Sequence, residues 1–244
     1  MPRWSASTQS GVTESIVGET VVQREQFAAD ELKAVLEQYD LGSIDSVQEF
    51  ARGSRRSPKA VITTPKGKFL LKRRASGKND PRRVAFSHSI QLHLAEHHFP
   101  LPRLIGTKVG RQTFFQSSGN IYELFDFIHG HTYPGTLEAT EDAGRVLAQF
   151  HQLLLDFSPP WHPAASTGYH QSQIVLESVK RIQAAGQIAQ EVLSQLQEMY
   201  SRASAQTKLE NWPKQIVHAD WHPGNLLFQH DHVLAVLDYD AARD

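Results

Sequence analysis

One polar stretch followed by two short apolar runs limits most strongly how this chain can fold. The stretch is His218–Asn225, with the sequence HADWHPGN, and the apolar runs 226–228 and 233–237 follow it. Four polar residues separate the two runs, which is the pattern of a β-hairpin. Paired Cα atoms on neighbouring strands lie roughly 5 Å apart. We therefore expect Asn225 and Asp238, at the two ends of the hairpin, to lie almost opposite each other.

The polar residues at the ends of this hairpin suit phosphoryl transfer. That chemistry needs a carboxylate beside the attacking hydroxyl and oxygen ligands for Mg²⁺, because the protein mainly positions the reacting groups. Asp220 can supply the carboxylate, and Asn225 and Asp238 can supply the oxygen ligands. Pro223-Gly224 is a turn signal, which places Asp220 on a loop. The alternative is a purely structural hairpin whose Asp and Asn side chains cap turns.

The stretch His218–Asn225, taken with Leu237-Asp238-Tyr239-Asp240, resembles the signature of the aminoglycoside phosphotransferase and choline kinase group. Members of that group have a protein-kinase-like fold. The resemblance implies an α+β, bilobal protein-kinase-like fold, with an antiparallel sheet in the N-terminal lobe and a mainly helical C-terminal lobe. It also implies ATP- and Mg²⁺-dependent transfer of the γ-phosphoryl group to a hydroxyl of a small molecule.

The resemblance assigns a role to each residue of the two motifs. Asp220 would be the catalytic base, and Asn225 and Asp238 would bind Mg²⁺. His218 is expected to brace the loop rather than to react. Asp240 is expected to assist the metal or to fix the turn.

The order of the remaining segments fits two lobes. Residues 1–22 read as a flexible extension with a short strand at 20–22, and residues 23–128 as the N-terminal nucleotide-binding lobe, with a hinge near 122–130. Residues 131–244 form the C-terminal catalytic lobe. Because members of the group continue with several more helices, this lobe is expected to be incomplete.

Apolar periodicity gives the elements within these lobes. It predicts helices over 24–39, 81–99, 138–154 and 172–201, the last with a break near Gly186, and strands over 46–51, 59–64, 68–73, 112–116 and 121–128.

Lys72, late in the third predicted strand, matches the phosphate-binding lysine of the group. Residues 53–57 lie at the tip between the first two strands, where Ser54 and Arg55 are candidates for phosphate binding. Kinase-like lobes usually carry a Glu on the following helix, which orients the lysine. The helix over 81–99 has no carboxylate there. Either His88 or a carboxylate from another element substitutes, or nucleotide affinity is weak.

The stretch 122–130 resembles the hinge between the lobes. Backbone groups near Phe125 and Phe127 would then bind the adenine edge of ATP, and apolar side chains would sandwich its ring. An edge strand in a core gives the same pattern without a ligand. The segment 151–215 carries five acidic and five basic residues, and this balance disfavours a polycationic acceptor.

Composition narrows the class of partner. The 244 residues include no cysteine, which excludes disulfides, zinc thiolate sites and a thiol nucleophile. No apolar run approaches the ~20 residues that span a bilayer, so a cytoplasmic protein without a membrane partner is expected. Twelve Lys or Arg residues and a single acid lie between Arg52 and Arg83. Nucleic-acid binding through that segment is the weakest hypothesis. The main alternative to a kinase is a catalytically impaired nucleotide-binding or scaffolding protein of the same fold.

Overall fold

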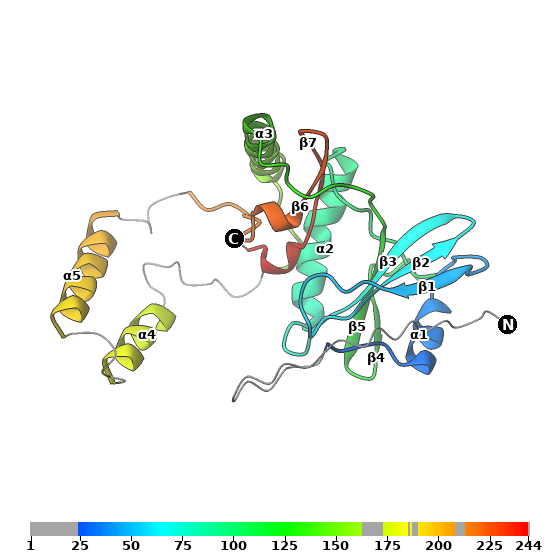
Figure 1. Cartoon of the computed structure of the whole chain (residues 1–244), viewed down its shortest axis with the longest axis horizontal. Helices are drawn as coiled ribbons and strands as arrows, with labels where there is room; N and C mark the ends of the chain where they lie inside the picture. The colour runs from blue at the N-terminus through cyan, green and yellow to red at the C-terminus, as the bar shows by residue number, and fades with distance from the viewer. Residues whose placement is uncertain (1–23, 163–172, 185, 187–189, 208–212, 244) are drawn as a thin grey trace, which may run out of the picture.

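The computed structural model describes residues 24–162, 173–184, 186, 190–207 and 213–243 (Figure 1). In chain order the elements are α1 (Ala29–Leu36), β1 (Ser46–Glu49), β2 (Lys59–Thr64), β3 (Gly67–Arg73), α2 (Pro81–Glu96), β4 (Phe115–Ser117), β5 (Asn120–Asp126), α3 (Leu137–Leu154), α4 (Gln173–Ala184), α5 (Gln190–Thr207), η3 (Pro223–Asn225), β6 (Leu226–Gln229), β7 (His232–Val236) and η4 (Tyr239–Ala241).

Strands β1 to β5 form an antiparallel sheet in the order β1-β2-β3-β5-β4. Helix α1 packs against one face of it (Figure 1). The core between them consists of Leu32, Val35, Leu36, Tyr39, Leu41, Ala60, Ile62, Phe69, Leu71, Tyr122 and Leu124. Side chains alternate along a strand, so the intervening residues of β2, β3 and β5 extend from the opposite face. That face carries the candidate site.

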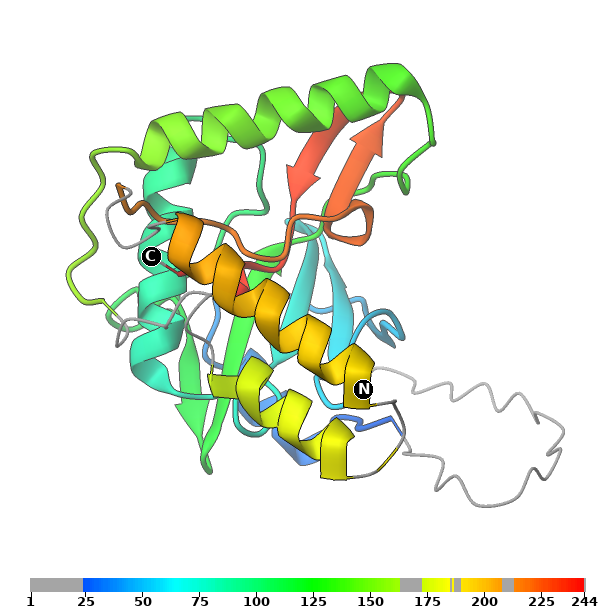
Figure 2. The same cartoon turned by 90° about the vertical axis from the view of Figure 1, so that its left-hand side faces the viewer.

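A second core joins α2, α3 and the hairpin β6–β7. Its main members are Phe86, Ile90, Leu94, Val146, Phe150, Leu154, Leu226, Phe228, Val233 and Val236. Figure 2 shows α3 lying across the hairpin. Helix α2 is thus packed with the helical part, although the sequence places it between two strands of the sheet.

The hairpin predicted behind the polar stretch is present. Gln229 pairs with His232, which leaves a two-residue turn whose first member, His230, has φ 55°. Helix α3 holds this turn, because Asp142 Oδ2 accepts a hydrogen bond of 2.7 Å from the backbone N–H of Val233. Burial alone would raise the pKa of Asp142, but this bond and Arg145 outweigh it and lower the pKa.

Several predicted elements are shorter than expected, and two of them begin at least three residues later than predicted. Residues 24–28 are not helical, because the backbone N–H of Glu25 donates to Arg55 O at 2.9 Å and the Arg24 side chain donates to the carbonyls of residues 53 and 54. Strand β4 begins at Phe115 rather than at 112, because Gln112 exchanges hydrogen bonds with Thr107 in a turn. A contact with a distant segment decided the first boundary, and a local turn decided the second.

The predicted helical segment 172–201 forms two helices, α4 and α5, which lie side by side (Figure 2). The strand predicted at 20–22 lies outside the described residues. Among the described helices, none is long and apolar enough to cross a membrane.

Candidate active site

Asp220 lies on the loop that leads into the hairpin. A short 3-10 turn over Pro223–Asn225 reverses the chain, and the side chain of His222 caps it by accepting from the Gly224 N–H at 3.0 Å. The turn brings Asn225 back to Asp220, and Asn225 Nδ2 donates to Asp220 Oδ2 at 2.8 Å and to its backbone carbonyl at 3.0 Å. These bonds hold the Asp220 carboxylate in place. The carboxylate is about half exposed, so a ligand can reach it.

His218 connects the two motifs. Its Nδ1 accepts from the Asp220 N–H at 3.3 Å, and its Nε2 lies 3.0 Å from the carbonyl of Leu237, to which it donates. The ring is buried and makes an edge contact with Tyr239. Burial lowers the pKa of His218 below its ordinary value, which favours the neutral ring that these two bonds require.

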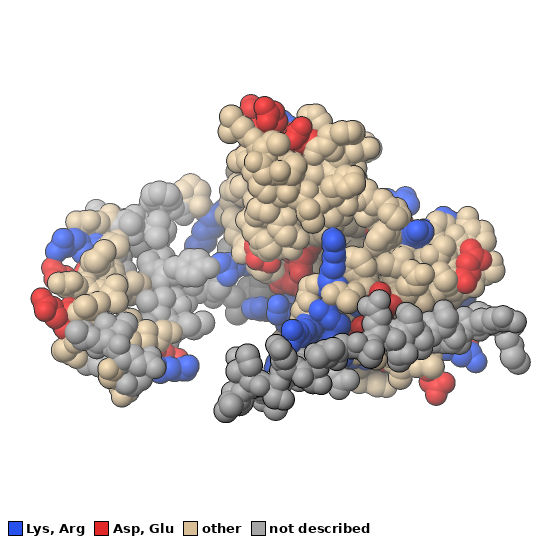
Figure 3. Space-filling model, viewed as in Figure 1, with Lys and Arg blue, Asp and Glu red and all other residues tan. Residues whose placement is uncertain are grey.

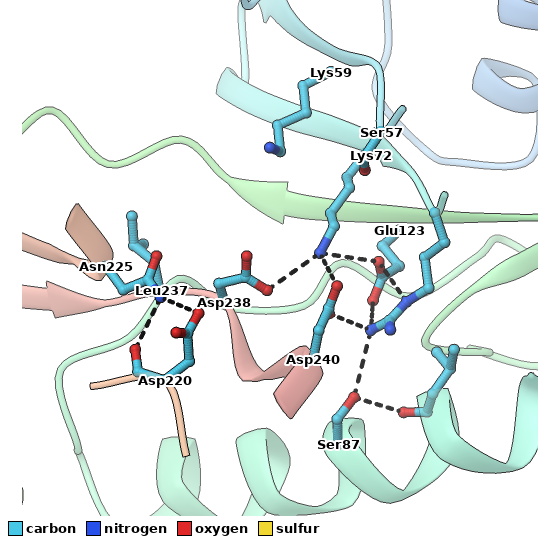
Figure 4. Close-up of polar contacts among 12 residues, drawn as sticks. Ser57, Lys59, Lys72, Ser87, Glu123, Asp220, Asn225, Leu237, Asp238 and Asp240 are labelled. Carbon is cyan, nitrogen blue, oxygen red and sulfur yellow. Dashed lines mark hydrogen bonds and ion pairs between the residues drawn. The ribbon is translucent and has the colours of Figure 1, made fainter. Parts of the chain in front are cut away.

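The hairpin register differs slightly from the one we predicted. Leu226 pairs with Val236, and the Leu237 N–H donates to Asn225 O at 2.8 Å, so Leu237 stands opposite Asn225. Asp238 follows one position later in a left-handed conformation, with φ 59° and ψ 75°. This conformation ends the strand. Figure 4 shows the Asp238 side chain between Asn225 and Lys72.

Lys72 projects from β3 into a group of carboxylates. Its Nζ lies 2.9 Å from Asp240 Oδ2, 3.6 Å from Asp238 Oδ1 and 4.0 Å from Glu123 Oε2. Burial alone would lower the pKa of Lys72, but these carboxylates, Glu123 above all, outweigh it and raise the pKa. The lysine therefore stays charged in a largely buried position.

Glu123 on β5 is the carboxylate that helix α2 lacks. It is buried, and its register partner on β3 is Lys72. Arg74 binds both of its oxygens, through Nε at 3.0 Å and Nη2 at 2.8 Å, and a second contact from Nη2 reaches Asp240 Oδ1 at 2.9 Å. Helix α2 takes part through His88, whose Nε2 lies 2.6 Å from Glu123 Oε1. We expected His88 or a carboxylate from another element beside Lys72, and the structure has both in one buried network. Figure 4 shows the part of this network that contains Lys72, Glu123 and Asp240.

The cations of this network stabilise the ionised form of its carboxylates. Burial alone would raise the pKa of Glu123, but Lys72 and Arg74 outweigh burial and hold the pKa far below its ordinary value. Burial would likewise raise the pKa of Asp238, and Lys72 is the main cause that lowers it. Both carboxylates are therefore ionised at neutral pH.

The face of the sheet that carries Lys72 also has an apolar row. Val61, Leu70 and Phe125 are register partners on β2, β3 and β5, and each is partly exposed. Such a row suits one side of an aromatic ring. The backbone N–H of Phe127 already donates to Lys68 O at 2.9 Å. The predicted contact of this stretch with adenine therefore has to use other backbone groups than the Phe127 amide.

The structure brings together some of the predicted site residues and not others. Asp220, Asn225, Asp238, Asp240, His218 and Lys72 are joined by direct contacts or by one intermediate residue. Ser54 and Arg55 lie in the exposed loop between β1 and β2, where the contacts recorded for the described residues tie them to Arg24, Glu25 and the loop itself. Their contact with phosphate stays a prediction.

Sequence reasoning missed Glu123 and Arg74 as members of the network around Lys72. A signal was present for Glu123, because it is the one carboxylate inside the apolar run that starts at Ile121 and ends at Phe125. The position of Arg74, two residues after Lys72 and therefore on the same face, was a second signal.

The donor set at Asn225 and Asp238 fits a hard cation. Asn225 uses its Nδ2 on Asp220, so its Oδ1 is the atom left for a metal, and Asp238 adds carboxylate oxygens. Among the described residues, no group of three or more His, Asp or Glu side chains could hold a metal alone. Mg²⁺ commonly takes one or two protein oxygens and completes its shell with phosphates and water.

Comparisons with known proteins agree with this geometry. The model of a family described as "Phosphotransferase enzyme family" matches residues 46–243. The chain is 25% identical over 222 residues to a homoserine kinase of Zymomonas mobilis subsp. mobilis, covering 86% of this chain and 64% of that protein. It is 27% identical over 228 residues to a homoserine kinase of Bradyrhizobium diazoefficiens, covering 88% and 64%. The chain thus spans less than two thirds of the length of these relatives.

Solved structures show the same fold. The amicoumacin kinase hAmiN, in complex with AMP-PNP, Ca²⁺ and Ami, has a TM-score of 0.65 at 15% identity, covering 87% of this chain and 63% of that one. An aminoglycoside phosphotransferase from Alicyclobacillus acidocaldarius has a TM-score of 0.61 at 19% identity, covering 86% and 66%. These likenesses confirm the bilobal protein-kinase-like fold that the sequence predicted.

Proposed function

We propose that this chain, which belongs to the phosphotransferase enzyme family, transfers the γ-phosphoryl group of ATP to a hydroxyl group of a small molecule in a Mg²⁺-dependent reaction. One observation carries the proposal. The hairpin region and the sheet bring three kinds of group to one place. These are the exposed carboxylate of Asp220, the side-chain oxygens of Asn225 and Asp238 that can bind a metal ion, and the fixed ammonium of Lys72.

In this proposal Asp220 orients the acceptor hydroxyl and takes its proton. The hydroxyl oxygen forms a bond to the γ-phosphorus while the bond to the leaving ADP oxygen breaks. Asn225 supports this role because its amide holds one carboxylate oxygen of Asp220 at 2.8 Å. The other oxygen lies 3.7 Å from Nε2 of the exposed His222, a longer contact that leaves it accessible to the acceptor hydroxyl.

Asn225 and Asp238 would hold Mg²⁺, which when bound neutralises charge on the phosphates. Lys72 would bind the phosphates directly, and Glu123 with Arg74 would fix its position. The row of Val61, Leu70 and Phe125 offers an apolar surface to the nucleobase.

Homoserine is a reasonable first acceptor because the two relatives above are homoserine kinases. The equal number of acids and bases over 151–215 disfavours a polycationic acceptor such as an aminoglycoside. Other small alcohols remain candidates and belong in the same assay.

The proposal is tested by measuring ADP release with Mg²⁺ and a panel of small alcohols that includes homoserine. Asp220→Asn should lower kcat by at least ~100-fold, as expected for loss of a general base, with little change in the Kd of ATP. Equal rates for wild type and Asp220→Asn on every acceptor would remove Asp220 from the mechanism. ATP binding in calorimetry without turnover on any acceptor would favour the non-catalytic nucleotide-binding alternative.

A further inference from the structure

Lys59 and Lys72 form a pair of cations on the face of the sheet that carries the candidate site. They are register partners on β2 and β3. Their neighbours Ala60 and Leu71 belong to the core under α1, so both lysines extend from the opposite face. Figure 4 shows the two side chains reaching from the sheet toward the segment that carries Asp238.

The two lysines differ in their partners. Lys72 is surrounded by three carboxylates within 4.0 Å. Across the part of the chain that the structure describes, no carboxylate oxygen comes within 4.0 Å of Lys59 Nζ, and its recorded hydrogen bond goes to the carbonyl of Arg52 at 3.2 Å. Burial lowers the pKa of Lys59 and the charge of Lys72 lowers it further, while the more distant Asp238 and Asp240 offset only part of this lowering.

The loop between β1 and β2 bends closely around the Lys59 ammonium. Arg52 supplies the accepting carbonyl, and the next residue, Gly53, has φ +80°. A Cβ added to Gly53 would lie 2.7 Å from Lys59 Nζ. The ammonium is therefore held at the base of the loop that we predicted to contact phosphate.

Among the three cations of this face, Lys59 is the one that has no carboxylate in direct contact within the described residues. Arg74 is matched by Glu123, and Lys72 by Asp240, at less than 3 Å in each case. Lys59 is partly buried and faces another cation, an arrangement that an incoming anion relieves. An ammonium has three donors, so Lys59 can keep its bond to Arg52 and still bind two oxygens of an anion.

We propose that Lys59 is a second phosphate-binding residue, which binds the phosphate chain of a nucleoside di- or triphosphate from β2 while Lys72 binds it from β3. The inference rests on the proposed function, because that function brings such a nucleotide to this face. It adds a binding residue outside the motifs that identified the site.

Calorimetry with adenosine, AMP, ADP and ATP in the presence of Mg²⁺ tests this role. Lys59→Met should raise the Kd of ADP and ATP by ~10-fold, because a hydrogen bond to a charged group is lost, and should leave the Kd of adenosine unchanged. Lys59→Arg should restore most of the affinity. The matched control is Lys66→Met at the other end of the same hairpin, where Lys66 pairs with Asp40; it should bind every ligand as the wild type does.

The outcomes separate this inference from the proposed function. If the wild type binds ATP and Lys59→Met binds it equally tightly, Lys59 has no phosphate role and the inference fails alone. If Lys59→Met weakens adenosine as much as ATP, or lowers the unfolding temperature of the free protein, Lys59 is structural and the inference also fails. If the wild type binds neither ADP nor ATP, the proposed function itself fails.

Discussion

Lys72 on β3 and Asp240 after β7 form an ion pair of 2.9 Å although 168 residues separate them in the chain. Asp240 also reaches Arg74 Nη2 at 2.9 Å. One carboxylate from the helical part thus compensates two buried cations of the sheet. Figure 3 shows acidic and basic side chains lying close together near the centre of this face of the molecule.

Asp240→Asn should destabilise the free protein by about 3 kcal/mol, because it leaves two buried cations short of a partner. Urea unfolding followed by fluorescence gives the free energy of unfolding. The control is Asp40→Asn, which breaks an exposed ion pair with Lys66 and should change the free energy little. Equal effects of the two substitutions would mean that Asp240 is not a structural link between the parts.

Glu123→Gln should affect the nucleotide rather than the acceptor. The substitution keeps the size of the side chain but removes the charge that faces Lys72 and Arg74. We expect the KM of ATP to rise by ~10-fold, since one charged hydrogen-bond network is disrupted, while the KM of the acceptor stays constant. Steady-state kinetics with each substrate varied separately measures both. The exposed Glu49→Gln serves as the control, and a parallel rise in both KM values would point to general loss of structure.

His218 should make stability depend on pH. Burial lowers the pKa of the folded ring below the ordinary value of 6.5, so near and below that pH the unfolded chain binds more protons than the folded one. The stabilisation is present above about pH 6.5 and is lost as the pH falls toward the lowered pKa. Urea midpoints measured from pH 8 to pH 5 should fall less steeply in His218→Gln than in wild type. The exposed His131→Gln should keep the wild-type slope.

Gly130, where the chain crosses from β5 toward the hairpin, has no room for a side chain. A Cβ there would lie 2.9 Å from Leu227 Cβ and 3.3 Å from Leu234 Cδ2. Gly130→Ala should therefore destabilise the protein by about 1–3 kcal/mol through overpacking. Gly144→Ala on α3, where a Cβ meets nothing within 4 Å, should stabilise it by up to about 1 kcal/mol. Thermal unfolding distinguishes the two signs, and stabilisation by Gly130→Ala would contradict the packing described for this crossing.

Local pattern was enough to predict much of the fold and part of the site. Strand β2 spans the predicted residues, and the hairpin β6–β7 follows the polar stretch as expected, because alternation and turn chemistry act between near neighbours. The turn signal Pro223-Gly224 likewise predicted a loop at Asp220, and the structure has a 3-10 turn over Pro223–Asn225.

The remaining features depend on segments far apart in the sequence. The amino-acid sequence by itself determined the motif, the strands and the place of Lys72 on the third strand, because each depends on residues that are close together along the chain. Only the tertiary structure decided that Glu123 lies beside Lys72, that Asp240 joins Lys72 and Arg74, and that Lys59 is on the same face of the sheet. The physical reason is that strand register and lobe packing determine which groups lie next to a buried charge. A local sequence pattern contains no information about either.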